Sequence, residues 1–110
     1  MHTWIRLGSA IVALAAAAPA AAQERTFTLR IVEHRFVPTE IEVPAGAKIK
    51  LVIKNEDATP EEFESVTLRR EKVIPGKSEG FVYVGPLSPG RYEFFGDYNQ
   101  KTARGFLVVK

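Results

Sequence analysis

The residues of this 110-residue chain that could do chemistry are mainly carboxylates, and they gather in two places. Glu61, Glu62 and Glu64 lie within one acidic stretch, whereas Asp97 follows a run of aromatic residues near the C-terminus. His34 supplies an imidazole far from both in the sequence. Carboxylates and imidazoles can bind metal ions or transfer protons, but only when a fold brings them together.

The composition excludes several classes of function. The chain has no cysteine, so thiol catalysis, iron–sulfur clusters and thiolate-bound copper are ruled out. The sequence also contains no recognisable serine–histidine–carboxylate set and no glycine-rich phosphate loop, so enzymatic activity has little support. Basic and acidic residues alternate and the net charge is only +2, which argues against nucleic-acid binding.

The N-terminus has the pattern of a signal peptide. Arg6 supplies a positive charge, residues 11–18 form an apolar run, and residues 19–22 are the small residues that signal peptidase prefers. An uncleaved membrane anchor is the alternative, but the run is short and alanine-rich compared with the roughly 20 residues that span a bilayer. We therefore predict a signal peptide at 1–23 and a periplasmic or otherwise exported domain at 24–110.

Beyond residue 23 the sequence predicts about seven short strands separated by turn signals, and no segment has a helical period. This pattern predicts an all-β sandwich or barrel. The side chains expected to face inward from the first three strands are Phe27, Leu29, Ile31, Ile41, Val43, Ile49, Leu51 and Ile53. Further strands are predicted at 70–74 and 81–84, whereas residues 55–65 lack alternation and are predicted to be a long, functional loop.

The last twenty residues predict two strands joined by a polar loop. Tyr92 and Phe94 share one face of the first strand, which breaks at Gly96, and residues 106–109 form the second.

Short motifs throughout the predicted domain resemble those of cupredoxins, which are small Greek-key β-sandwiches that carry copper. The general motifs are Phe36 with Pro38, Val43–Gly46, Asn55 with Asp57, Pro89–Tyr92 and Gly105–Val109. A second group is similar to exported, cupredoxin-like proteins associated with bacterial ferrous-iron uptake; it comprises Thr59–Ser65, Arg70–Lys72, Phe94–Asp97 and Thr102–Ala103.

The resemblance breaks down at the residues that would bind blue copper. That site needs a thiolate, two imidazoles and a weak axial thioether. By the spacing of the closing loop in cupredoxins, Gly96 stands at the cysteine position, Asn99 at a histidine, and Thr102 or Ala103 at the methionine. The other histidine position falls within 60–63, which contains none. We therefore predict no type 1 copper site.

The topology implied by the resemblance brings the turn at 34–37, the acidic stretch 55–65 and the loop 96–104 to one end of the sandwich. That placement would make a metal site from one nitrogen and several carboxylates, with the candidate ligands His34, Glu61, Glu62, Glu64 and Asp97. Iron, manganese, zinc or cupric copper would suit such a set. The expected function is handling of iron or copper as an accessory to periplasmic iron uptake, with an iron-uptake permease as a possible partner.

The same residues could instead have structural roles. His34 continues the outward phase of the first strand and could be a solvated side chain. The three glutamates could form a charged loop that pairs with Arg69 and Arg70. If that segment is extended, Glu62 and Glu64 share a face and form the better functional pair.

The closing loop has a structural alternative as well. Asp97 and Asn99 could hydrogen-bond their own loop backbone, as short polar side chains often do. Two alternative functions also stay open: a metal-free interaction module that recognises a basic partner through its acidic segment, and a ferroxidase-like activity at a bound metal.

Overall fold

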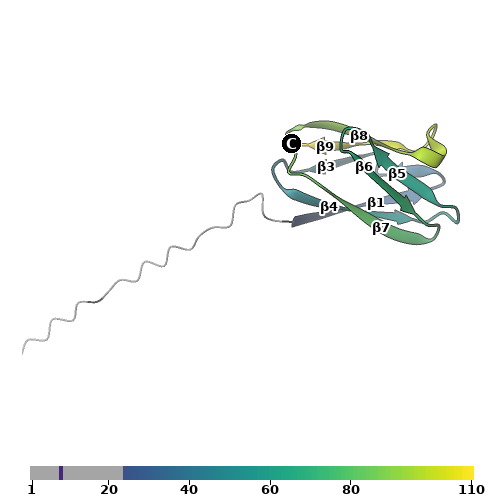
Figure 1. Cartoon of the computed structure of the whole chain (residues 1–110), viewed down its shortest axis with the longest axis horizontal. Coiled ribbons are helices and arrows are strands. Elements are labelled where there is room, and N and C mark those ends of the chain that lie inside the picture. The colour runs from purple at the N-terminus through teal and green to yellow at the C-terminus, as the bar shows by residue number, and fades with distance from the viewer. Residues whose placement is uncertain (1–7, 9–23) are drawn as a thin grey trace, which may run out of the picture.

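The alternating segments of the sequence form strands in the computed structural model, which describes residue 8 and residues 24–110 (Figure 1). The strands build two sheets that pack face to face, and the only described helix is the 3-10 turn η2, Asp97–Asn99. No helix among these residues has the length and apolar character needed to cross a membrane. Apart from Gly8, the predicted signal peptide at 1–23 lies outside the described residues.

Both sheets are mixed. The four-stranded sheet has the order β2-β1-β4-β7 and consists of β1 (Glu24–Val32), β2 (Arg35–Val37), β4 (Lys48–Asn55) and β7 (Ser78–Val84). The five-stranded sheet has the order β3-β9-β8-β5-β6 and consists of β3 (Glu40–Val43), β5 (Glu61–Ser65), β6 (Arg70–Ile74), β8 (Gly90–Gly96) and β9 (Arg104–Val109). The pairs β1·β4 and β3·β9 are parallel, and the others are antiparallel. The all-β sandwich prediction is therefore confirmed.

The core lies between the sheets and is centred on three aromatic rings. Phe36 and Phe94 meet edge to face with ring centroids 5.0 Å apart, and Phe63 lies 5.4 Å from Phe94. All three are fully buried. The inward residues predicted on the first three expected strands are also buried, except Phe27, which is half-buried. Alternation alone thus identified the part of the core that β1, β3 and β4 supply, because side chains of a strand point alternately to its two faces.

One prediction about this core was wrong. Residues 55–65 are not one long loop, since Asn55 ends β4, residues 61–65 form β5, and only 56–60 connect the two. The buried positions on β5 include Glu61 and Ser65. Polar side chains at inward positions conceal the apolar alternation by which a strand is recognised.

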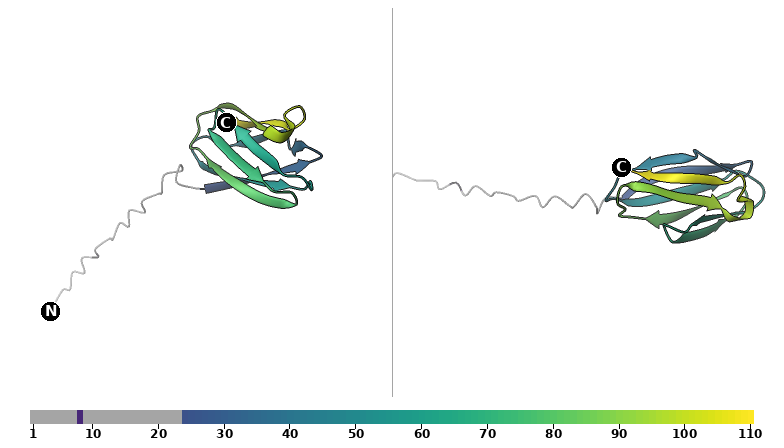
Figure 2. Two further views of the ribbon diagram at one scale, coloured as in Figure 1. Left: turned by 45° about the vertical axis from the view of Figure 1, so that its right-hand side comes forward. Right: turned by 90° about the horizontal axis from the view of Figure 1, so that it is seen from above.

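Three connections meet at the end of the sandwich opposite the C-terminus (Figure 2). The turn between β1 and β2 has positive φ angles at Glu33 (51°) and His34 (59°). The Asp57 carboxylate accepts hydrogen bonds from the backbone N–H groups of both residues, at 2.8 and 2.9 Å. On the other side, the Thr102 hydroxyl donates to the His34 carbonyl at 2.6 Å. The predicted meeting of these connections at one end is confirmed.

Candidate metal-binding site

The candidate site is organised by β5, whose glutamates alternate between the core and the outer face of the five-stranded sheet. Glu61 is buried on the inner face together with Phe63, whereas Glu62 and Glu64 are half-buried on the outer face. β5 lies between β6 and β8, so both of its edges are paired. The two outer carboxylates therefore lie on an interior strand of the sheet.

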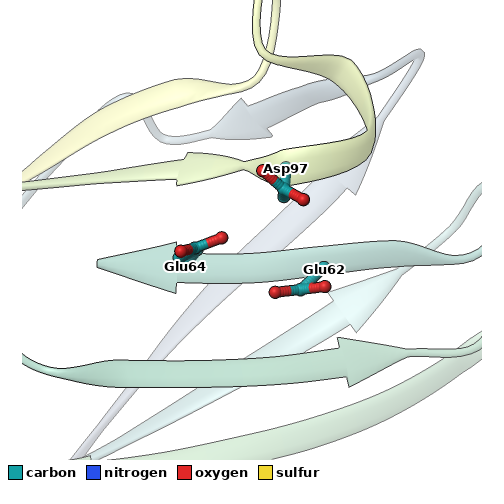
Figure 3. Close-up of side chains that lie close together, drawn as sticks. All are labelled: Glu62, Glu64 and Asp97. Atoms are coloured by element: carbon teal, nitrogen blue, oxygen red, sulfur yellow. The ribbon is translucent and has the colours of Figure 1, made fainter. Parts of the chain in front are cut away.

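Asp97 completes a group of three carboxylates with Glu62 and Glu64. It begins η2 directly after β8, and its side chain points toward β5 (Figure 3). One carboxylate oxygen from each residue lies within 4.8 Å of the others, a spacing at which the three could share one cation. Gln100 Nε2 donates to Asp97 Oδ1 at 2.7 Å, which orients the Asp97 carboxylate.

This acidic cluster, Glu62, Glu64 and Asp97, carries uncompensated negative charge. Partial burial raises the pKa of Glu62, and the charges of Asp97, Glu64 and the neighbouring Glu71 raise it further. Glu71 lies directly opposite Glu64 on β6. Within residues 24–110, no salt bridge reaches any of these carboxylates, and in particular Arg70 donates instead to the Tyr83 carbonyl at 2.7 Å. A cation placed among these carboxylates would therefore offset the repulsion at Glu62.

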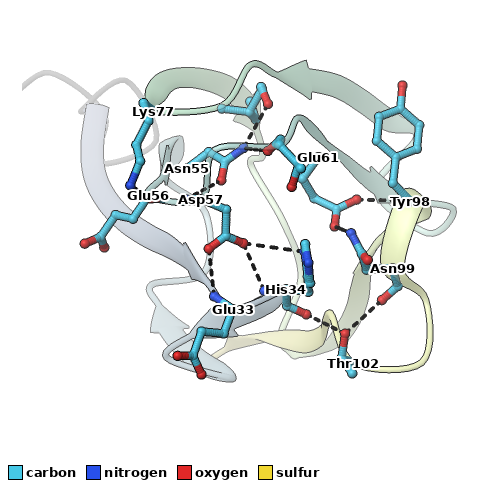
Figure 4. Close-up of polar contacts among 12 residues, drawn as sticks. Glu33, His34, Asn55, Glu56, Asp57, Glu61, Lys77, Tyr98, Asn99 and Thr102 are labelled. Atoms are coloured by element: carbon cyan, nitrogen blue, oxygen red, sulfur yellow. Dashed lines mark hydrogen bonds and ion pairs between the residues drawn. The ribbon is translucent and has the colours of Figure 1, made fainter.

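Glu61 does not join this cluster, because its carboxylate points into the protein (Figure 4). Its Oε1 atom accepts the backbone N–H of Tyr98 at 2.9 Å and that of Glu62 at 3.0 Å. Its Oε2 atom accepts Asn99 Nδ2 at 2.7 Å. Both carboxylate oxygens are therefore occupied by hydrogen-bond donors, so this geometry leaves Glu61 poorly suited to bind an ion.

The residues at the positions of the blue-copper ligands have structural contacts instead. Gly96 is buried against Glu61, and a Cβ atom at Gly96 would lie 2.6 Å from Glu61 Cδ. Asn99 is a hydrogen-bond donor to the same carboxylate, Ala103 is buried, and Thr102 bonds the His34 carbonyl. None of these side chains supplies sulfur or imidazole, so the residues present do not fit type 1 copper.

His34 also lies apart from the acidic cluster. Its half-exposed imidazole has Nδ1 3.6 Å from Asp57 Oδ2, and it is not in the group formed by the three carboxylates. Burial alone would raise the pKa of Asp57, but the backbone N–H groups of His34 and Glu33 bring that pKa below its ordinary value. The predicted five-residue set is thus divided among three places: the cluster, the interior and the β1–β2 turn.

Sequence reasoning used Asn55 and Asp57 only as a family motif and assigned neither residue a structural role next to the site. Asn55 is buried at the end of β4, and its Nδ2 atom donates to the carbonyls of Thr59 at 2.8 Å and Ile74 at 3.1 Å. Its Oδ1 atom accepts the Asp57 backbone N–H at 3.1 Å. The Asn-x-Asp spacing at a strand end is the signal that could have indicated this structural role. Both residue types commonly hold turns through side-chain hydrogen bonds.

Comparison with known proteins supports the family resemblance. The family model described as cupredoxin-like domain matches residues 5–109. An uncharacterized protein of Rickettsia prowazekii is 48% identical over 81 residues, which are 74% of this chain and 65% of that protein. The matched region therefore spans about two-thirds of the length of that relative.

Solved structures show likeness of fold. The blue copper protein auracyanin A of Chloroflexus aurantiacus has a TM-score of 0.69 at 16% identity, covering 80% of this chain and all of that one. The metal-binding domain of the Cu(I)-exporting ATPase CopA of Streptococcus pneumoniae has a TM-score of 0.67 at 16% identity, covering 86% and 91%. Amicyanin of Paracoccus versutus has a TM-score of 0.60 at 16% identity, covering 84% and 85%.

Proposed function

The chain belongs to the cupredoxin-like family, and from that premise we propose that it is an exported accessory protein that binds a hard transition-metal ion on its acidic cluster. The observation that carries the proposal is the convergence of Glu62, Glu64 and Asp97 within 4.8 Å, with no described basic residue in a salt bridge to them. A cation placed among them would offset the mutual repulsion that raises the pKa of Glu62.

The donor set selects the class of metal. Three carboxylates offer only oxygen, which suits ferrous or ferric iron and manganese and does not favour Cu(I), a soft ion that prefers sulfur ligands. The copper of the blue copper protein auracyanin A is therefore not the ion that this surface fits best. Calcium and magnesium also prefer oxygen ligands, so they are the natural competitors in an exported compartment.

The proposed setting is iron uptake in the periplasm, where the domain would pass iron to, or receive it from, a permease. Two features support this role. The pattern at 59–65 resembles exported proteins of ferrous-iron uptake, and its two outer glutamates provide most of the cluster. The cluster also lies on the surface of the sheet, where an ion can exchange with a partner rather than being enclosed.

Titration of the full chain with ferrous iron under anaerobic conditions, and separately with Mn²⁺, Zn²⁺ and Cu²⁺, tests the proposal. We expect one equivalent of iron or manganese to bind, and binding to be lost in the double variant Glu62→Gln/Glu64→Gln. At a free ion concentration of about 100 times Kd, bound metal should stabilise the fold by about 2.7 kcal/mol, which a thermal unfolding scan would detect.

Two controls make the test specific. Glu40→Gln and Glu42→Gln remove carboxylates from β3 of the same sheet, where each is paired with a basic side chain, and binding should be unchanged. His34→Ala should also retain binding, because the imidazole lies outside the cluster. If no ion binds stoichiometrically to the wild-type chain, the metal-binding proposal is wrong, and loss of binding in His34→Ala alone would contradict the site assigned here.

A metal-free docking surface is the second candidate, because apolar groups flank the acidic cluster. Val73 lies opposite Glu62 on β6 and is 47% exposed, and Tyr98 follows Asp97 and is 51% exposed. Exposed apolar groups beside unpaired carboxylates suit a partner with a basic surface. This candidate predicts that Tyr98→Ala weakens binding of the partner without changing metal affinity, and that partner binding weakens as salt is raised.

A further inference from the structure

We propose that Glu61 is a positioning residue: its buried carboxylate ties η2 to β5 without a metal ion and thereby holds Asp97 beside Glu62 and Glu64. The metal-binding half of this inference rests on the proposed function, whereas the tie itself does not. Glu61 therefore has a different role from Glu62 and Glu64, which follow it on the same strand.

Three hydrogen bonds to the Glu61 carboxylate build the tie, and two of them cross from β5 to η2. Glu61 is 1% exposed, and its carboxylate joins its own strand at Glu62 N–H to η2 at Tyr98 N–H and Asn99 Nδ2. The two η2 donors come from the residues directly after Asp97. Fixing them fixes the start of η2, and with it the direction in which Asp97 leaves β8.

The sequence of β8 makes room for this tie. A Cβ atom at Gly96 would lie 2.6 Å from Glu61 Cδ and 2.7 Å from Ala103 Cβ. Contacts that short force a neighbour to move, so a side chain at this position would displace the Glu61 carboxylate or Ala103. Gly96 and Ala103, two positions without copper-ligating side chains, are thus the small residues that enclose the Glu61 carboxylate.

The same contacts mean that the β8–β9 connection can be held in place without a metal ion. In this domain the connection between β8 and β9 is fixed to β5 by hydrogen bonds to the Glu61 side chain, so its order requires no bound ion. The acidic cluster is consequently assembled before a metal arrives. Such preorganisation removes the cost of ordering Asp97 on binding.

Two measurements on the full chain test the inference: hydrogen exchange of the Tyr98 amide by NMR, and Mn²⁺ affinity by electron paramagnetic resonance. In Glu61→Ala we expect the Tyr98 amide to exchange at least tenfold faster and Mn²⁺ to bind about tenfold more weakly, as expected when hydrogen bonds to a charged group are lost. Glu61→Gln keeps the shape and can still accept the Tyr98 N–H, so both readouts should return to within about threefold of wild type.

Asp97→Asn is the matched control for a ligand. It should weaken Mn²⁺ binding while leaving Tyr98 exchange unchanged. If Glu61→Ala proves too unstable to study, Gly96→Ala tests the same tie, because its added Cβ displaces the Glu61 carboxylate and should also speed Tyr98 exchange.

The outcomes separate this inference from the proposed function. Unchanged Tyr98 exchange in Glu61→Ala overturns the tie whatever the metal does. Faster exchange with unchanged Mn²⁺ affinity overturns the positioning role, and loss of Mn²⁺ binding in Glu61→Gln as complete as in Asp97→Asn makes Glu61 a ligand instead. A wild-type chain that binds no Mn²⁺ refutes the positioning of a metal site together with the proposed function, while the exchange data still decide the tie.

Discussion

The two faces of β5 place the same kind of side chain in opposite circumstances. On the inner face, the Glu61 carboxylate is fully buried and both of its oxygens accept hydrogen bonds. On the outer face, Glu62 and Glu64 are half-buried and close to Asp97, and partial burial together with the charges of Asp97 and Glu64 raises the pKa of Glu62. Glu61 and Glu62 are neighbours on the strand, yet Glu61 is a structural hydrogen-bond acceptor and Glu62 is a candidate metal ligand.

The difference shows that burial alone does not decide what a carboxylate does. A buried charge is tolerated when donors satisfy its oxygens, and Glu61 has backbone and amide donors. A half-buried carboxylate without such donors is costly to ionise, and the cost is relieved when a cation binds. Function should therefore be sought on the face where the carboxylates lack partners.

Removal of the buried carboxylate should have the largest effect. Glu61→Ala leaves the Tyr98 N–H and the Asn99 amide without an acceptor, so we expect the free energy of unfolding to fall by about 3 kcal/mol. Urea denaturation measures the change. Glu62→Ala, one position away on the other face, is the control and should cost far less; equal losses for the two variants would contradict the contrast between the faces.

Crowding the inner face should have the next largest effect. Gly96→Ala introduces a Cβ atom 2.6 Å from Glu61 Cδ, and overpacking of this kind costs about 2 kcal/mol. Gly90→Ala, at the other end of β8, is the control, because its Cβ would meet nothing closer than 3.6 Å. Chemical denaturation of the single and double variants should show that Gly96→Ala costs less in the Glu61→Ala background, and strict additivity would count against contact between the two side chains.

Asp57 offers a second carboxylate with satisfied oxygens, at the β1–β2 turn. Asp57→Ala leaves the Glu33 and His34 N–H groups without their acceptor, so we expect a loss of about 1.5–3 kcal/mol. Because the folded-state pKa of Asp57 is below its ordinary value of 3.8, its contribution is present above that pH and is lost as pH falls through the folded-state value.

The pH dependence of Asp57→Ala can be checked by urea denaturation across the acid range. The difference in stability between wild type and Asp57→Ala should shrink below pH 3.8. Glu56→Gln, which breaks the exposed pair with Arg30, is the matched control and should cost less than about 1 kcal/mol. A difference that stays constant on acidification would mean that the charged form of Asp57 is not what holds the turn.

The fold and the three carboxylates of the acidic cluster could be predicted from the sequence. Alternation identified the core residues that β1, β3 and β4 supply, and the phase of β5, if extended, placed Glu62 and Glu64 on one face. The proximity of Asp97 followed from the expected topology. These features depend on local periodicity and on a widely shared framework, both of which are visible in one sequence.

The remaining part of the site depends on contacts between distant segments. Glu61 is stable in the interior only because η2, which lies 37 residues further along the chain, presents a backbone N–H at Tyr98. His34 turns toward Asp57 rather than the cluster because the turn backbone at 33–34 is bonded to that carboxylate. Hydrogen bonds between distant segments leave no periodic pattern in the sequence. The sequence alone therefore could not separate the five candidates into metal ligands and structural residues.

The smallest expected effect concerns the outer face and has the opposite sign. The folded-state pKa of Glu62 is raised above its ordinary value of 4.5, so ionisation of Glu62 destabilises the metal-free fold. That penalty is absent at pH values below 4.5, where Glu62 is protonated in both states, and reaches its full size once pH exceeds the folded-state pKa. Glu62→Gln should therefore stabilise the metal-free chain at neutral pH and make little difference in acid.

Thermal unfolding of wild type and Glu62→Gln in chelator, repeated across the acid to neutral range, measures this effect. Glu42→Gln, whose carboxylate is paired with Lys110, is the control and should not be stabilising at any pH. Adding Mn²⁺ should reverse the order at neutral pH, because bound metal stabilises the wild type and not the variant. A variant less stable than wild type in chelator would show that Glu62 already has a favourable partner, and the distinction between the two faces of β5 would then fail.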